Sequence, residues 1–133
     1  MRAAIAWGVV VGLAQTASPL VFWWLDPATV YAVGLALIAS IYIGFAVADG
    51  RVRIIVVECV VATAFVVVAT VGITGPAWLL AFGFAAHGAK DAWQQRSHFV
   101  TGTRWWPPFC AAIDWVVALL IVVEIVAGIH VRP

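Results

Sequence analysis

Charged side chains are scarce in this sequence. Only 10% of the 133 residues are Asp, Glu, Lys or Arg, whereas 65% are hydrophobic. A soluble globular domain carries about 25% charged residues, because water must solvate its surface. The scarcity therefore excludes a soluble globule and predicts an integral membrane protein, with residues 1–133 forming one transmembrane helical domain.

The sequence also has few cysteines and a net charge close to zero. The seven basic residues nearly balance the six acidic ones, and without a basic field there is no reason to expect nucleic-acid binding. The two cysteines, Cys59 and Cys110, lie in or beside apolar segments, which predicts reduced, buried thiols and no disulfide framework. No cofactor is called for, and the expected partners are membrane lipid or a hydrophobic small molecule.

Five apolar runs make up most of the chain, and each approaches the roughly 20 residues that a helix needs to cross a bilayer. The connections between them are short, so neighbouring helices must be antiparallel. The first run reaches spanning length without a small-x-small cleavage site, which favours a retained helix over a signal peptide. The expected fold is all-α, a bundle of five transmembrane helices. The runs cover about 3–25, 28–48, 52–73, 77 into the polar stretch at 87, and 109–129.

The basic residues predict the orientation of this bundle. With five spans, six of the seven basic residues fall on one side of the membrane, which the positive-inside rule assigns to the cytoplasm. The N-terminus is then cytoplasmic and the C-terminus outside, in a multi-pass protein of the plasma (inner) membrane. The six are Arg2, Arg51, Arg53, Lys90, Arg96 and Arg104, and Arg132 stands alone on the other side.

Polar side chains are concentrated between residues 87 and 99. Their spacing places four of them within roughly 60° of one another on a helix of about 100° per residue. These are His87, Asp91, Gln94 and His98, with Lys90 beside them. A helix that leaves the membrane with one wetted face accounts for the later residues. It accounts less well for His87, which lies two turns deeper in the apolar run.

Two acidic residues on other runs reach the depth of His87. Glu58 and Asp114 each lie seven residues inside their helices from the same end, which is about 10 Å at 1.5 Å per residue. An ionisable group that faces lipid costs about 2.5–3.5 kcal/mol or more, so all three should face the bundle interior. We expect one shared polar pocket. The alternative is a local pairing of Glu58 with Arg51 or Arg53.

Such a pocket predicts general acid–base catalysis on a lipid-soluble, isoprenoid-like substrate, by an isomerase, a cyclase or an epoxide-opening enzyme. Glu58, among apolar neighbours, is the expected protonated acid, and His87 is the expected base. Asp114, ionised beside Lys90 or Arg104, would orient His87, and tryptophan faces would stabilise a carbocation. The catalytic candidates are Glu58, His87, Asp91 and Asp114. The substrate-binding candidates are Trp105, Trp106, Trp115, Lys90, Arg104 and His98.

Two other functions stay open. His87 and Asp91 stand at i and i+4, a spacing that can chelate a metal together with His98 or Glu58. Lys90 beside them would repel a cation, so no metal is expected. A non-enzymatic membrane subunit or a small carrier would use the same polar cluster as structural support, or as a path for protons or substrate.

Small and polar residues also predict contacts between helices. The Gly8-x-x-x-Gly12 spacing permits a close helix crossing, within the chain, in a homodimer or with a membrane-complex partner. Gln15 and Glu124 lie at similar depths in the first and last runs. We expect a hydrogen bond between them to lock these two helices together.

The run H-G-A-K-D-A-W-Q-Q-R-S-H-F, followed by T-R-W-W-P-P-F-C-A-A-I-D, resembles a motif of small uncharacterised bacterial multi-helix membrane proteins, chiefly from GC-rich genomes. It covers residues 87–114, about a fifth of the chain, and implies a defined loop but no reaction. Two prolines after this loop predict a sharp, ordered turn over residues 97–106. In architecture and residue types alone, the chain is also similar to five-helix sterol isomerases and small membrane terpene and carotenoid cyclases, from which no residue roles transfer.

Overall fold

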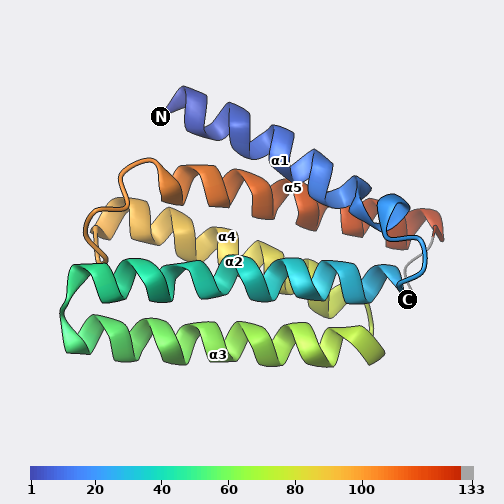
Figure 1. The fold of residues 1–133 in the computed structure, drawn as a ribbon. Coiled ribbons are helices and arrows are strands. Elements are labelled where there is room, and N and C mark those ends of the chain that lie inside the picture. The colour runs from blue at the N-terminus through green and yellow to red at the C-terminus, as the bar shows by residue number, and fades with distance from the viewer. Residues whose placement is uncertain (130–133) are drawn as a thin grey trace.

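A computed structural model describes residues 1–129 of the chain, and all regular secondary structure in that range is helical (Figure 1). This confirms the all-α prediction and the number of helices. The C-terminal residues, with Arg132 and the predicted exterior C-terminus, lie outside the described range. The helices are α1 (Arg2–Val21), α2 (Pro27–Asp49), α3 (Val52–Thr74), α4 (Trp78–Ser97) and α5 (Trp106–Ala127).

Local sequence explains where the helices begin and end. Asp26 caps α2 by accepting a hydrogen bond from the Ala28 amide at 2.9 Å, and Gly50 ends the helix with a left-handed φ of 81°. The first helix ends several residues before its predicted end at residue 25. Helix α5 begins earlier than predicted, because two prolines fit within its first turn, where their missing N–H groups are not needed.

Four of the helices, α1, α2, α3 and α5, are long and apolar enough to cross a membrane. Helix α4 has the length but carries polar and charged residues along its second half. The outward-facing large side chains of the bundle are largely Val, Leu, Ile, Phe and Trp, which are exposed along every helix. Such a surface suits lipid better than water. The fold therefore defines the chain as an apolar helical bundle of the membrane-protein type.

The helices are arranged so that α5 lies between α1 and α4, and α2 lies against α3 (Figure 1). Gly8 and Gly12 of α1 make the close crossing that their spacing predicts, and the partner is α5 of the same chain. A Cβ on Gly8 would overlap the carbonyl oxygen of Phe109, and a Cβ on Gly12 would lie 3.0 Å from the Val116 Cβ. The small residues thus serve α1–α5 packing.

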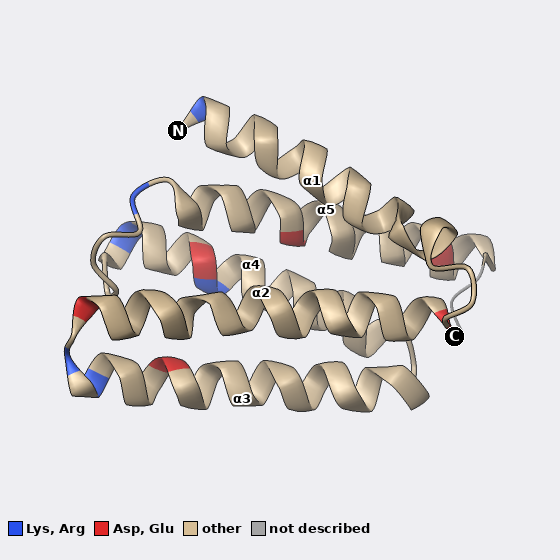
Figure 2. Cartoon of the chain, in the orientation of Figure 1, with Lys and Arg blue, Asp and Glu red and all other residues tan. Residues whose placement is uncertain are grey.

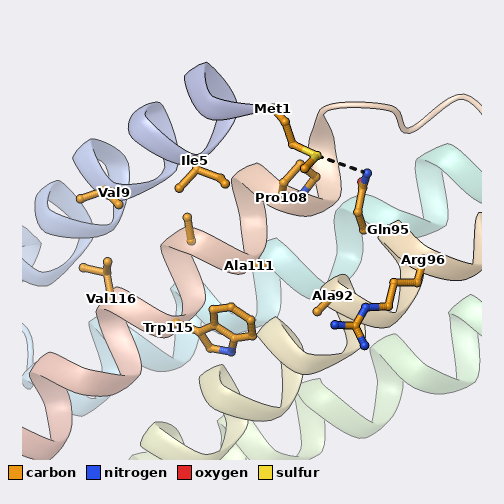
Figure 3. A pocket seen from close by; sticks show the side chains of 11 residues that line it. Met1, Ile5, Val9, Ala92, Gln95, Arg96, Pro108, Ala111, Trp115 and Val116 are labelled. Carbon is orange, nitrogen blue, oxygen red and sulfur yellow. Dashed lines mark hydrogen bonds between the residues drawn. The ribbon is translucent and has the colours of Figure 1, made fainter.

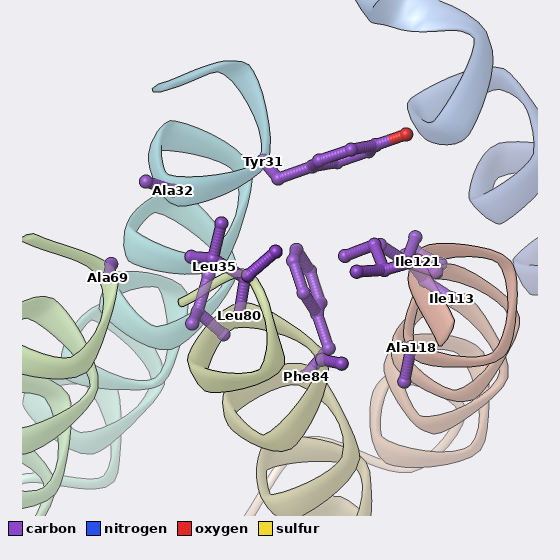
Figure 4. Packing of buried hydrophobic residues seen from close by; sticks show 12 residues of the cluster. Tyr31, Ala32, Leu35, Ala69, Leu80, Phe84, Ile113, Ala118 and Ile121 are labelled. Carbon is purple, nitrogen blue, oxygen red and sulfur yellow. The ribbon is translucent and has the colours of Figure 1, made fainter. Parts of the chain in front are cut away.

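Two clusters of buried apolar side chains stabilise opposite halves of the bundle. The larger is built around Leu35, Leu80, Phe84 and Ile121 (Figure 4). The smaller consists of Tyr42, Ala46, Ile54 and Val100, near the α4–α5 loop. Along α4 the buried polar side chains follow Phe84 and precede the loop, so a polar layer separates the two apolar clusters.

The basic residues of the described chain gather at one end of the bundle, as predicted. Figure 2 shows them at the end that holds the N-terminus, the α2–α3 turn and the α4–α5 loop. The acidic residues within α3 and α4 lie in the same half of the bundle, whereas α5 carries one near its middle and one near the opposite end (Figure 2). This end is therefore the more polar of the two, and the deep acids are within reach of cations.

The α4–α5 loop is held by hydrogen bonds to the α2–α3 turn, which confirms the prediction of a defined loop. Asp49 accepts hydrogen bonds from the amide and hydroxyl of Thr101 at 2.8 and 2.6 Å. It also accepts two from Arg51, whose guanidinium donates in turn to the Phe99 carbonyl at 2.9 Å. Asp49 raises the pKa of Arg51, mainly through these hydrogen bonds. The polar end is thus tied together across all but the first helix.

Candidate functional site

One face of α4 changes from apolar to polar along its length. Leu80 and Phe84 occupy the first half of this face, and His87, Asp91 and Gln94 continue it at alternating spacings of three and four residues. None of these side chains exceeds 1% exposure. Burial of polar side chains in this series is costly unless other helices supply partners, and the site is defined by those partners.

His87 is held by acidic residues on two helices. Its Nδ1 atom lies 2.8 Å from Oδ2 of Asp114 on α5 and 3.5 Å from Oδ2 of Asp91, one turn further along α4. The first distance is a hydrogen bond, which fixes the orientation of the imidazole ring. The sequence-based expectation that Asp114 orients His87 matches this geometry. We name Asp91, His87 and Asp114 the Asp–His–Asp cluster.

Glu58 of α3 pairs with α4. Lys90 Nζ donates a hydrogen bond to Glu58 Oε2 at 2.7 Å and lies 3.3 Å from the centre of the Tyr42 ring. The alternative pairing of Glu58 with Arg51 or Arg53 is therefore wrong. The expected contact of Lys90 with Asp114 is wrong as well, because Lys90 bonds to Glu58 and Asp114 bonds to His87.

Tyr42 connects this ion pair with the Asp–His–Asp cluster. Its ring holds the lysine on one side and meets the His87 ring edge-on, with the ring centres 6.1 Å apart. Phe65 of α3 packs on the same imidazole at 4.8 Å. The predicted shared layer thus consists of two adjoining groups, an ion pair and an Asp–His–Asp cluster, with aromatic rings between and around them.

Several buried polar atoms of this layer receive no hydrogen bond within the described part of the chain. They include both carboxylate oxygens of Asp91, Oδ1 of Asp114, the Tyr42 hydroxyl and Oε1 of Gln94. A buried polar atom left in this way costs about 1–3 kcal/mol, and more if the group is charged. Oxygens concentrated in this way mark a place where a proton, a cation or a polar group of a substrate would be stabilised.

Two of the tryptophans expected to bind substrate, Trp105 and Trp106, lie away from the Asp–His–Asp cluster. Trp105 is 55% exposed and packs on Trp106 and Phe109. Trp106 packs against Phe45 beside the smaller apolar cluster. Five grooves of about 300–570 Å³ on the described part of the chain are lined by none of Glu58, His87, Asp91 and Asp114. The four side chains are buried together inside the bundle, apart from these five grooves.

Trp115 belongs to a different feature, a groove of about 570 Å³ between α1, α4 and α5 (Figure 3). The groove is walled by apolar side chains such as Ile5 and Val9, and Arg96 lies among its lining residues. The groove adjoins the Asp–His–Asp cluster at Gly88. A Cβ there would meet Trp115 Nε1 at 2.5 Å and Asp114 Cβ at 3.2 Å.

Two other predicted residues lie away from the buried cluster. His98 ends α4 in a left-handed conformation with φ 51°, and its side chain is exposed, so it leaves the stripe that a continued helix would have given it. Arg104 is exposed in the α4–α5 loop. Neither contributes to the Asp–His–Asp cluster.

Sequence reasoning missed the tyrosines of α2. Tyr31 and Tyr42, eleven residues apart, share a helix face at about 100° per residue, and each meets an acidic or charged group. Tyr31 donates hydrogen bonds to the two carboxylate oxygens of Glu124 at 3.0 and 3.2 Å. Gln15, the partner expected for Glu124, lies with its side-chain amide against Gly34 of α2. The signal for both positions was a tyrosine inside an apolar run, since a buried phenol needs a partner.

Comparisons with protein-family models, with curated proteins and with solved structures give no match for this chain. The functional argument therefore depends on the geometry of the site.

Proposed function

We propose that this chain is an integral membrane enzyme that acts on a lipid-soluble, isoprenoid-like substrate by general acid–base catalysis. The observation that carries the proposal is the fully buried Asp–His–Asp cluster, in which the His87 ring is oriented by a carboxylate at 2.8 Å. A histidine held in this way can take a proton from a substrate or return one at its other ring nitrogen. The apolar surroundings keep water from competing for that proton.

The membrane setting of the proposal includes α4 as a fifth span. From residue 78 to residue 93 the outward face of α4 consists of Trp78, Phe82, Ala85, Ala89 and Trp93, all exposed and none charged, and the exposed Arg96 follows in the last turn. Its ionisable residues at 87 and 91 point into the bundle. An inverted helix of this kind can cross lipid, because its polar groups find partners on neighbouring helices. With five spans, the basic end faces the cytoplasm of a plasma membrane and the N-terminus is inside.

The roles that we assign differ from the sequence-based ones at Glu58. A carboxylate 2.7 Å from a lysine is engaged in an ion pair, so apolar walls alone no longer argue for a protonated acid at that position. We assign proton transfer to His87 and to Asp91, whose oxygens receive no hydrogen bond within residues 1–129. Asp114 orients the imidazole, and the Glu58–Lys90 pair positions Tyr42 against it.

The groove between α1, α4 and α5 is the proposed route for the substrate. Its apolar walls and its place on the outside of the bundle suit a hydrocarbon that arrives from the bilayer. Gly88 is the point where groove and cluster adjoin, so a small displacement of Trp115 there would connect them. Trp115 could then also stabilise a carbocation in the substrate.

Solvent isotope incorporation tests this proposal without a known substrate. Membranes that contain the protein are incubated in D2O with a total isoprenoid and lipid extract, and the lipids are analysed by high-resolution mass spectrometry. We expect at least one lipid to gain carbon-bound deuterium in the presence of the wild type. His87→Asn and Asp114→Asn should lose this signal, while the carboxylate control Glu124→Gln should retain it. Equal lipid profiles for the wild type and a folded His87→Asn variant would contradict the proposal.

Burial of the whole cluster favours a second candidate, a non-enzymatic membrane subunit or small carrier. Glu58, His87, Asp91 and Asp114 are each 2% exposed or less, as in a structural network or a proton path. In that case proteoliposomes would show His87-dependent proton flux or no flux at all, and the lipid extract would acquire no deuterium.

A further inference from the structure

We propose that His87, Asp91 and Asp114 form a binding site for one divalent transition-metal cation. Each of the three offers a ligand atom, and these atoms lie within 4.8 Å of one another. The inference does not depend on the proposed enzymatic function, since the site could serve a metal in an enzyme, a carrier or a structural subunit.

The distances are close to those of a formed metal site. Ligands about 2.0–2.2 Å from a zinc-like ion are roughly 3–3.6 Å from each other. Of the two separations from His87 Nδ1, the 3.5 Å to Asp91 lies within that range and the 2.8 Å to Asp114 lies just below it. The three ligand atoms lie within 4.8 Å of one another, so an ion would have to draw the two aspartates closer by side-chain rotation.

Unsatisfied oxygens give the second and independent argument. Asp91 is 0% exposed, and within the described chain neither of its carboxylate oxygens receives a hydrogen bond. Oδ1 of Asp114 is also buried and receives no hydrogen bond from the described residues. Buried carboxylates are paired with cations or coordinate metals, and the imidazole between the two aspartates offers them a single nitrogen.

Charge balance also favours a divalent ion. Lys90 is already neutralised by Glu58 at 2.7 Å, so the repulsion expected from its position in the sequence is offset. If both aspartates are ionised and the imidazole is neutral, the remaining cluster carries two negative charges in an apolar interior. One divalent cation cancels that charge, whereas protonation of the histidine alone would cancel half of it.

The ligand types indicate which metals fit. One imidazole with two carboxylates suits zinc, manganese, iron or cobalt, and is a poor set for magnesium or calcium, which prefer all-oxygen sites. Three protein ligands leave at least one coordination position open, as in catalytic rather than structural sites.

Metal loading of the full-length protein tests the inference. The protein is purified in detergent with a tag free of histidine, stripped with chelator and titrated with Co²⁺. We expect one equivalent per chain by elemental analysis, and visible d–d absorption bands that indicate four or five ligands including nitrogen. Zn²⁺ should displace the Co²⁺ and remove the bands.

Substitutions of the proposed ligands test whether these residues bind the metal. Asp91→Asn and Asp114→Asn should each raise the Kd for Co²⁺ at least about tenfold. Glu124→Gln, the same type of change elsewhere on α5, and His98→Gln, at an exposed histidine, should leave the Kd unchanged. Retained affinity in both aspartate variants would overturn the assignment. If those variants do not fold, the titration of the wild-type protein still tests the inference. Fewer than about 0.1 equivalents of bound metal per wild-type chain would overturn the metal site.

Discussion

Replacing Lys90 by methionine should destabilise the bundle more than any comparable change at a basic residue elsewhere in the described chain. Lys90 is 13% exposed and Glu58 is 2% exposed, with 2.7 Å between the charged atoms. At that distance the charges attract by about 6 kcal/mol at an effective dielectric constant of about 20. Methionine keeps most of the side-chain volume but leaves the Glu58 carboxylate buried without its cation.

Removal of one partner from a buried pair typically costs about 3–5 kcal/mol. The contact of Nζ with the Tyr42 ring adds up to about 2 kcal/mol when desolvated. Because part of Lys90 reaches solvent or headgroups, we expect Lys90→Met to lower the free energy of unfolding by about 3–4 kcal/mol. The double variant Glu58→Gln/Lys90→Met leaves no buried charge at the pair and should be more stable than Lys90→Met alone.

The measurement is a double-mutant cycle in bicelles, with reversible unfolding followed by tryptophan fluorescence and circular dichroism. We expect a coupling energy of at least about 2 kcal/mol between the two positions. Arg53→Met, at an exposed basic residue on α3, is the control and should change stability by no more than about 0.5 kcal/mol. A cost below about 1 kcal/mol for Lys90→Met, or additive single costs, would refute the buried ion pair.

Three further predictions address packing, the loop and topology. Gly8→Val should destabilise the chain by about 1–3 kcal/mol through overpacking against α5, whereas Gly44→Val, where a Cβ meets nothing within 4 Å, should cost far less in the same unfolding assay. Asp49→Ala should speed amide hydrogen exchange at Thr101, whose N–H donates to that carboxylate at 2.8 Å, and an unchanged rate would count against the loop network. Arg104→Cys, in a variant without Cys59 and Cys110, should react with a membrane-impermeant thiol reagent only after cell lysis. Labelling in intact cells would contradict the proposed orientation.

The number of helices, the depth of the ionisable residues within them and the clustering of basic residues could all be predicted from the sequence. Each depends on local properties, namely run length, the 1.5 Å rise per residue and the position of turn residues. The polar face of α4 followed from the helical period in the same way. The period failed only at His98, where the chain turns left-handed and ends the helix.

Partners across helices could not be predicted, because they depend on which helices are neighbours and how far each side chain reaches. Lys90 was expected near Asp114, yet its flexible stem carries the ammonium to Glu58 on α3. Glu124 was assigned to Gln15, but Tyr31 of α2 reaches it. Similar depth was a necessary condition for these contacts and left several pairings open.

Composition and helical periodicity are enough to predict an apolar helical bundle with a few costly ionisable groups at one depth, because both act through local physics. Helix packing brings Asp114 and Asp91 to one nitrogen of His87 and places Tyr42 between this cluster and the Glu58–Lys90 pair. It also places the groove that contains Trp115 beside the cluster. The reason is that these contacts join α2, α3, α4 and α5, and no local preference of one segment specifies which residue of another helix will face it.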